Sequence, residues 1–281
     1  MPQAYFVNLG IAIYNLPRVS VAPFGFNIYW YGIIVALGFA SGLLYTYLEA
    51  KKTGQNPNFY IDIFFPIFIG AIVGARLYFV IFNWSMYASD LASIFAVRSG
   101  GLAIYGGILG GASAALIYAR IKGYNLGLMS DTTTPGLLFG QAIGRWGNFF
   151  NREAFGGYTD SLFALRYRAD DVSFIPASVY ERMITVNGVD YIQVQPMFLY
   201  EFLANMVLFA LLMLYKRRKA FDGEIAMFYF MGYGLIRAVT ESFRTDQLMM
   251  FNTNVPVSQA LAIVMVLGSG FLLVRKRMQL R

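Results

Sequence analysis

The sequence predicts an all-α integral membrane protein with about seven transmembrane helices and a small extracytoplasmic head. Of its 281 residues, 58% are hydrophobic and only 13% are charged, whereas a soluble domain has about 25% charged residues. The apolar residues come in long blocks, and a block of about 20 of them is a candidate membrane span. We expect one membrane-embedded domain over residues 1–281, with residues 151–195 forming the head.

Apolar segments of this length recur along the chain. They cover residues 28–48, 59–82, 101–121, 130–150, 196–215, 224–243 and 256–274. The residues before the first segment lack the basic region and cleavage site of a signal peptide, so we expect the first span to begin after them. The fourth segment is the most polar, since it begins with SDTTTPG and ends in GRWGNFFNRE. The fifth begins after Pro196, which suits a helix start.

The basic residues of the connecting loops predict the orientation. One side carries Lys51, Lys52, the run KRRK at 216–219 and a basic C-terminal tail. The other side has fewer basic residues, and several of them lie in the long 151–195 segment among acidic residues. Because basic loops stay in the cytoplasm, the N-terminus and the head are expected outside and the C-terminus inside. Within the head, apolar and polar residues partly alternate around an NG turn in RMITVNGVDYIQVQ. This alternation predicts short strands.

The absence of two residue types limits the chemistry. The chain has no cysteine and no histidine, which excludes disulfides, Cys/His zinc sites, a cysteine nucleophile and a histidine base. We also expect no metal and no cofactor. The net charge of +7 is explained by loop basicity in a membrane protein, so we expect no nucleic acid partner.

Three arginines, Arg76, Arg145 and Arg237, lie inside the expected spans. A charged residue within the bilayer is costly and indicates a functional site. At 1.5 Å per residue, all three lie about 8–9 Å inward from the outer ends of their helices. Glu201 lies at a similar depth, and Tyr31 and Tyr105 lie slightly nearer the outer surface. This common level predicts a site for a lipid headgroup that approaches from the outer leaflet.

The stretch GRWGNFFNRE contributes one polar face. Helical spacing places Arg145, Asn148 and either Asn151 or Arg152 on the same side. The amides and the planar guanidinium suit the oxygens of a phosphate. The alternative is a helix end at which arginine snorkels to the interface and asparagine caps the terminus.

The stretch GYGLIRAVTESFR contributes a second polar face. Tyr233, Arg237, Glu241 and Arg244 recur at helical spacing and form one stripe. Arg237 and Glu241 are expected to pair, which neutralises both and still orients the arginine for a phosphate. Glu201 in QPMFLYEFLAN is either a base or a partner for arginine, and the three arginines at its level favour the partner role.

The glycine-rich stretch GGLAIYGGILGG has two interpretations. It lacks the strand and the lysine of a nucleotide-binding loop, whereas Gly106/Gly110 and Gly107/Gly111 are GxxxG pairs typical of helix packing. We expect packing. Tyr105 within this stretch lies at the polar level, and Arg76 either binds substrate or pairs with an acidic residue.

Several of these motifs together resemble the prolipoprotein diacylglyceryl transferase family. The resemblance rests on YWYGIIVALGF at 29–39, GARLYFVIFN at 74–83, GGLAIYGG at 100–107, GRWGNFFNREAFG at 144–156, QPMFLYE at 195–201 and DGEIAMFYFMGYGLIRAVTESFR at 222–244. It implies transfer of a diacylglyceryl group from phosphatidylglycerol to the lipobox cysteine of a preprolipoprotein, with release of glycerol-1-phosphate. It also implies a multi-pass protein of the bacterial cytoplasmic membrane whose site faces the outer leaflet.

The resemblance carries site residues with it. Arg145 and Arg237 match the family's essential arginines. Other functional positions are matched by Tyr31, Asn148, Asn151, Glu153, Gly156, Tyr233 and Glu241. We expect Arg145, Arg237, Tyr105 and Glu241 to be catalytic. The expected substrate-binding residues are Tyr31, Arg76, Asn148, Asn151, Glu153, Gly156, Glu201, Tyr233 and Arg244.

Two positions depart from the family's pattern. Many members have histidine where this chain has Tyr105 and where it has Gln195, and the histidine at the first position has been proposed as the base for the thiol. The base therefore stays open among Tyr105, Glu153 and Glu241.

Two other classes of protein fit part of the pattern. A transporter or flippase for an anionic lipid would use the same arginines, but its polar residues should continue to the cytoplasmic side. A lipid-binding scaffold explains two buried arginines less well.

Overall fold

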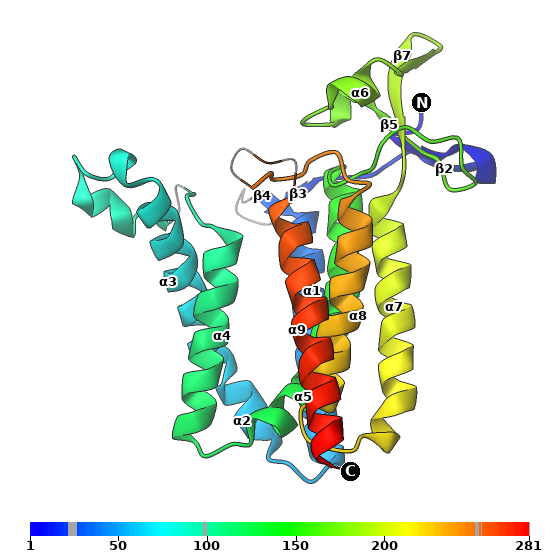
Figure 1. Cartoon of the computed structure of the whole chain (residues 1–281). Helices are drawn as coiled ribbons and strands as arrows, with labels where there is room; N and C mark the ends of the chain where they lie inside the picture. Colours follow the sequence, from blue (N-terminus) through cyan, green and yellow to red (C-terminus); the bar gives the residue numbers. More distant parts are fainter. Residues whose placement is uncertain (22–26, 98–99, 251–252, 254, 281) are drawn as a thin grey trace. The chain divides into compact units, whose positions relative to one another are not determined.

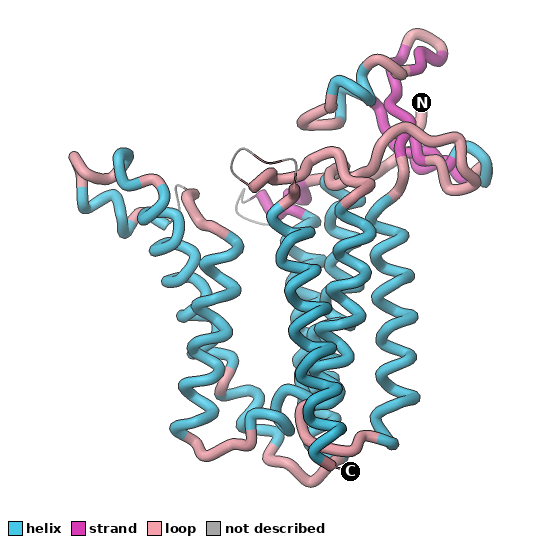
Figure 2. The backbone as a smooth tube through the Cα atoms, viewed as in Figure 1, coloured by secondary structure: helices cyan, strands magenta, loops and turns pink. Residues whose placement is uncertain are grey.

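The computed structural model describes residues 1–21, 27–97, 100–250, 253 and 255–280. Helices dominate the chain, and a small group of strands lies at one end of the long helices between residues 133 and 281 (Figure 2). Each apolar segment predicted from the sequence is helical over most of its length. The long helices are α1 (Trp30–Lys52), α3 (Phe64–Phe82), α4 (Ile104–Ile121), α5 (Leu126–Asn151), α7 (Met197–Tyr215), α8 (Glu224–Glu241) and α9 (Val257–Gln279). The short helix α2 (Pro57–Asp62) precedes α3.

Five helical segments in the described residues are long and apolar enough to cross a membrane. They are Trp30–Lys52, Pro57–Phe82, Ile104–Ile121, Met197–Arg218 and Val257–Gln279. Helices α5 and α8 are not among them. Both carry polar and charged residues along their length, including Arg145 in α5 and Arg237 in α8. The chain is thus a mostly helical, multi-pass membrane protein.

The chain divides into two compact units, and α1 and α5 each contribute to both. The first unit contains Met1–Leu44 and Thr133–Arg281, and the second contains Tyr45–Thr132. In the second unit, α3 and α4 pack along a glycine seam. A Cβ added at Gly106 would collide with the carbonyl oxygen of Gly74, and one at Gly110 with that of Gly70. The packing role predicted for the GxxxG pair Gly106/Gly110 is confirmed.

Glycines also bring together two helices of the first unit. A Cβ at Gly38 of α1 would lie 2.6 Å from the carbonyl oxygen of Gly140 in α5. Gly42 would meet Gly136 at the same distance. Helices α8 and α9 pack against each other, and α8 packs against α7. Leu138 of α5, Leu212 of α7, and Ile225 and Tyr229 of α8 form one buried cluster.

The head is a five-stranded sheet with the strand order β2-β1-β5-β7-β6. All neighbouring strands in it are antiparallel. Three of its strands, β2, β5 and β7, are labelled in Figure 1. The strands are β1 (Ala4–Phe6), β2 (Ile11–Ile13), β5 (Leu165–Arg168), β6 (Ile184–Val186) and β7 (Val189–Val194). The strands predicted around the NG turn are confirmed, because β6 and β7 join at Asn187 and Gly188, whose φ angles are 51° and 78°.

Part of the sheet comes from outside the predicted head. Strands β1 and β2 lie at the N-terminus, yet β1 pairs with β5. The sheet packs on a buried apolar cluster that includes Phe149 near the end of α5 and Phe198 near the start of α7. The head is therefore anchored on two of the long helices. Strands β3 (Val19–Val21) and β4 (Asn27–Tyr29) form a separate antiparallel pair before α1, and the short helix α6 (Ala177–Tyr180) belongs to the head segment.

Candidate functional site

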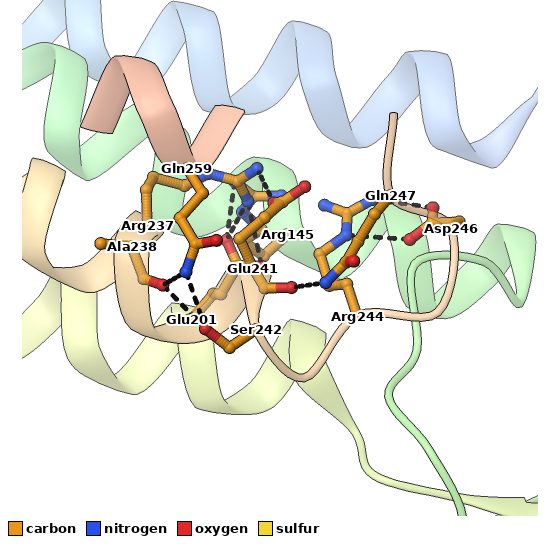
Figure 3. Close-up of polar contacts among 10 residues, drawn as sticks. All are labelled: Arg145, Glu201, Arg237, Ala238, Glu241, Ser242, Arg244, Asp246, Gln247 and Gln259. Atoms are coloured by element: carbon orange, nitrogen blue, oxygen red, sulfur yellow. Dashed lines mark hydrogen bonds and ion pairs between the residues drawn. The ribbon is translucent and has the colours of Figure 1, made fainter. Parts of the chain in front are cut away.

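An ion-pair cluster joins three helices of the first unit. Glu201 of α7 lies 2.7 Å from the guanidinium of Arg145 in α5 and 3.4 Å from that of Arg237 in α8. Arg237 also lies 2.5 Å from Glu241, one turn further along α8. These residues are drawn in Figure 3. The structure thus brings together Arg145, Glu201 and Arg237, which were predicted at a common depth, and it confirms the expected pairs of Glu201 with arginine and of Arg237 with Glu241.

Burial differs sharply between the two signs of charge. The side chains of Glu201 and Glu241 are 2% and 4% exposed, whereas those of Arg145 and Arg237 are 18% and 15% exposed. The cluster is neutral in total, with two carboxylates behind two guanidinium groups. A ligand that enters it meets positive charge first, and each guanidinium has five N–H donors, of which its carboxylate partners use only some.

A chain junction at Gly156 holds the ends of these helices together. The N–H of Gly156 donates to the carbonyl of Gln195 just before α7, and Gly156 forms a bridge with Arg244 just after α8. A Cβ at Gly156 would lie 2.7 Å from Oε1 of Gln195 and 3.0 Å from the carbonyl oxygen of Phe243. Only glycine permits this approach, so its place in the motif has a structural cause.

Arg244 lies beside the cluster in a pair of its own. Its Nε and NH2 groups donate to the two carboxylate oxygens of Asp246, at 2.9 and 2.8 Å. Burial alone would lower the pKa of Arg244, but the bonds to Asp246 outweigh burial and raise it. Arg244 therefore keeps its charge. In Figure 3, Gln259 of α9 donates to the carbonyl of Ala238 and to Ser242, which ties the start of α9 to the end of α8.

The polar residues at the end of α5 have different partners. Asn148 donates to the carboxylate of Glu153 at 3.0 Å. Helix α5 ends at Asn151, whose carbonyl accepts from Arg18 at 3.0 Å. Arg152 follows with φ 54° and is 3% exposed.

Arg152 is turned away from the face predicted for it. It donates to the carbonyl of Leu16 and lies 4.0 Å from Asp171 in the head. The expected face with Arg145 is therefore wrong for Arg152, because helical spacing no longer applies beyond the helix end.

Two predicted tyrosines lie on helices of the same unit. The ring of Tyr31, near the start of α1, covers Gly147 of α5, where an added Cβ would lie 2.9 Å from a ring carbon. Tyr233 stacks on Tyr229 with ring centroids 5.7 Å apart, and the Tyr229 hydroxyl donates to Gln141 at 3.1 Å. Gln141 was not among the predicted site residues, although it precedes Arg145 by one helical turn and this spacing places it on the same face of α5.

Arg76 and Tyr105 belong to the second unit. Arg76 is 6% exposed, and its five N–H groups donate to backbone carbonyls of one loop. The acceptors are the carbonyl oxygens of Ser93, Ile94, Ala96, Gly100 and Gly101. These partners are backbone carbonyls and not the acidic residue that one of the two interpretations of Arg76 expected. Tyr105 lies in the first turn of α4 and is half-buried. The site roles expected for these two residues stay predictions.

Comparison with known proteins identifies the family. The family model for prolipoprotein diacylglyceryl transferase matches residues 19–275. The chain belongs to the prolipoprotein diacylglyceryl transferase family. The match includes every element that carries the ion-pair cluster. Among the family's curated members, proteins called phosphatidylglycerol–prolipoprotein diacylglyceryl transferase are similar to this chain along nearly its whole length.

Three such relatives illustrate the similarity. The protein of Clostridioides difficile (strain 630) is 36% identical over 253 residues, which cover 90% of this chain and 92% of the relative. The protein of Listeria welshimeri is 33% identical over 272 residues, which cover 97% of this chain and 94% of the relative. The protein of Streptococcus pneumoniae (strain JJA) is 37% identical over 247 residues, which cover 87% of this chain and 88% of the relative.

Proposed function

We propose that this family member transfers the diacylglyceryl group of phosphatidylglycerol to the cysteine thiol of a preprolipoprotein lipobox. The thiolate sulfur attacks the glycerol carbon that bears the phosphate. A carbon–sulfur bond forms and the carbon–oxygen bond to the phosphate breaks. The thiol proton passes to a base, and glycerol-1-phosphate leaves. The products are a thioether-linked peptide and a phosphomonoester, so no oxidant or cofactor enters the balance.

The observation that carries the proposal is the pair of guanidinium groups held by buried carboxylates. As the carbon–oxygen bond breaks, negative charge develops on the departing phosphate. Preorganised positive groups aimed at developing charge are usually the largest single contribution to catalysis. Arg145 and Arg237 are fixed by Glu201 and Glu241 before any substrate arrives. They therefore stabilise the leaving group without reorganising.

Activation of the thiol is the smaller task. A cysteine thiol has a pKa of about 8.5, so its ionisation at pH 7 costs roughly 2 kcal/mol. By contrast, loss of one preorganised donor at developing charge costs about 3–4 kcal/mol. A weak or shared base is therefore sufficient. Tyr105, Glu153 and Glu241 are the candidates, and the carboxylates of the last two already accept from Asn148 and Arg237.

The location of the reaction follows from the charge distribution. We place the N-terminus and the head outside the cytoplasmic membrane and the C-terminus inside, with seven spans that include α5 and α8. The basic run at 216–219 and the C-terminal tail support this orientation. The ion-pair cluster then lies just beneath the outer headgroups. Phosphatidylglycerol enters from the outer leaflet, and the lipobox peptide approaches the same face.

The experiment combines purified protein, phosphatidylglycerol and a synthetic lipobox peptide, and mass spectrometry detects the products. The expected result is a peptide heavier by one diacylglyceryl group, with an equal amount of glycerol phosphate. A peptide with serine in place of the cysteine is the matched control and should stay unmodified. A folded protein that forms no adduct but moves phosphatidylglycerol across vesicle bilayers would contradict the proposal and support the transporter alternative.

A further inference from the structure

Asn205 of α7 is a buried amide for which the described residues provide no hydrogen-bond partner. Its exposed fraction is 0%, and within that part of the chain neither Oδ1 nor Nδ2 is hydrogen-bonded. Buried side-chain amides are nearly always hydrogen-bonded, and each exception needs an explanation. Among the described residues of the long helices, one other buried side chain has an unpaired polar atom. It is the hydroxyl of Thr240 in α8, which directly precedes Glu241. Both unpaired groups thus lie on helices that build the ion-pair cluster.

The position of Asn205 relates it to that cluster. It follows Glu201 by four residues, so the two side chains lie on the same face of α7, one turn apart. Gln141 also lies one turn from Arg145 on one face of α5, although it precedes the arginine in the chain. Tyr233 likewise precedes Arg237 by one turn on one face of α8. Each of these residues lies one turn further from the head than its charged neighbour. A second, uncharged polar layer therefore lies beneath the ion pairs.

Within this layer, Asn205 is the fully buried side chain whose polar atoms are unpaired among the described residues. Gln141 accepts the hydroxyl of Tyr229 at 3.1 Å, and Tyr233 stacks on Tyr229. Asn205 has one acceptor and two donor hydrogens that nothing in the described chain uses. An uncharged group that both donates and accepts hydrogen bonds would satisfy it.

We infer that Asn205 binds the headgroup hydroxyls of phosphatidylglycerol, an inference that rests on the proposed function. With the phosphate on Arg145 and Arg237, the headgroup glycerol extends one layer deeper along α7. A hydroxyl donates one hydrogen bond and accepts others, which matches the carboxamide. An ammonium headgroup only donates, so it leaves the amide donors of Asn205 unpaired. Asn205 is thus a specificity-determining residue for a glycerol headgroup.

The test compares two lipids that differ only in the headgroup hydroxyls, phosphatidylglycerol and phosphatidylpropanol with the same acyl chains. Their binding to purified protein is measured by lipid-dependent thermal stabilisation, and turnover with a lipobox peptide is measured separately. The variant is Asn205→Leu, which has a similar volume and leaves no cavity. Ser269→Ala in α9 is the control, since it removes a buried hydroxyl that bonds only to its own helix.

The wild type and the Ser269→Ala variant should bind phosphatidylglycerol about tenfold to a hundredfold more tightly than phosphatidylpropanol, as expected for a buried hydrogen bond. Asn205→Leu should lose this preference while its affinity for phosphatidylpropanol is unchanged. Equal discrimination by the variant and the wild type, or no discrimination by the wild type, would overturn the inference. Because binding is scored separately, absent turnover with intact discrimination would count against the proposed function alone.

Discussion

Glu201 of α7 lies 2.7 Å from Arg145 of α5 and 3.4 Å from Arg237 of α8, and its side chain is 2% exposed. One buried carboxylate thus holds two guanidinium groups from two other helices. Without it, the two like charges would repel each other. Glu201 therefore fixes the position of the two positive charges that we propose bind the phosphate.

Replacement of Glu201 by glutamine should both destabilise the protein and reduce turnover. The amide keeps the volume but removes the charge, which leaves Arg145 without an anionic partner and Arg237 with Glu241 alone. Breaking a buried ion pair typically costs about 3 kcal/mol or more. We expect a clearly lower melting temperature and turnover reduced about a hundredfold or more. Thermal unfolding in detergent and the adduct assay measure the two effects, and a stable, fully active variant would contradict this role.

Gly156→Ala should disrupt the junction that joins the ends of α5, α7 and α8. The new methyl group would lie 2.7 Å from Oε1 of Gln195 and 3.0 Å from the carbonyl of Phe243. Because backbone must move, we expect a loss of about 1–3 kcal/mol in stability together with lower turnover. Gly157→Ala is the matched control, since a Cβ there meets nothing within 4 Å. If the two variants behaved alike, the close approach at Gly156 would not matter.

Arg76→Lys should loosen the loop that Arg76 organises. Lysine keeps the charge but has three donors in place of the five that now bond to carbonyls between Ser93 and Gly101. We expect faster amide hydrogen exchange in residues 91–101, measured by mass spectrometry, with unchanged exchange in the head. If amide exchange in this loop did not change, Arg76 would not organise the loop. The substrate-binding role that was predicted from the sequence would then explain Arg76 better.

The pH dependence of turnover should identify the base. Tyr105→Phe, Glu153→Gln and Glu241→Gln each remove one candidate. A variant without the base must use substrate already ionised in solution, so its turnover should rise about tenfold per pH unit up to a pH near 8.5. The other two variants should keep the wild-type pH profile. Near wild-type turnover of Tyr105→Phe at neutral pH would exclude the tyrosine.

Local patterns in the sequence predicted much of the site. The pairing of Arg237 with Glu241 follows from their spacing on one helix, and the common depth of Arg145, Glu201 and Arg237 follows from the rise per residue. The hairpin of β6 and β7 follows from alternation around an NG turn. The residues of the helix pair and of the hairpin are close in the sequence, and the depth of a residue follows from its position along its helix.

The remaining features depend on contacts that no local pattern encodes. Pairing of β1 with β5 joins segments far apart in the chain, and nothing in AYF specifies that partner. Arg152 does not lie on its predicted face because α5 ends at Asn151. Helix ends are hard to place from sequence. Arg76 binds backbone carbonyls, which every residue possesses, so its partners carried no sequence signal. These features required the three-dimensional structure.

Single-turnover thioether formation by wild-type protein and by Arg145→Ala decides whether Arg145 stabilises the departing phosphate. Both are measured at saturating phosphatidylglycerol and lipobox peptide, after thermal unfolding has shown that the variant is folded. We predict that the wild type forms the adduct and that Arg145→Ala slows it by about 10²–10³ or more. Adduct formation by folded Arg145→Ala at a rate close to that of the wild type would contradict it.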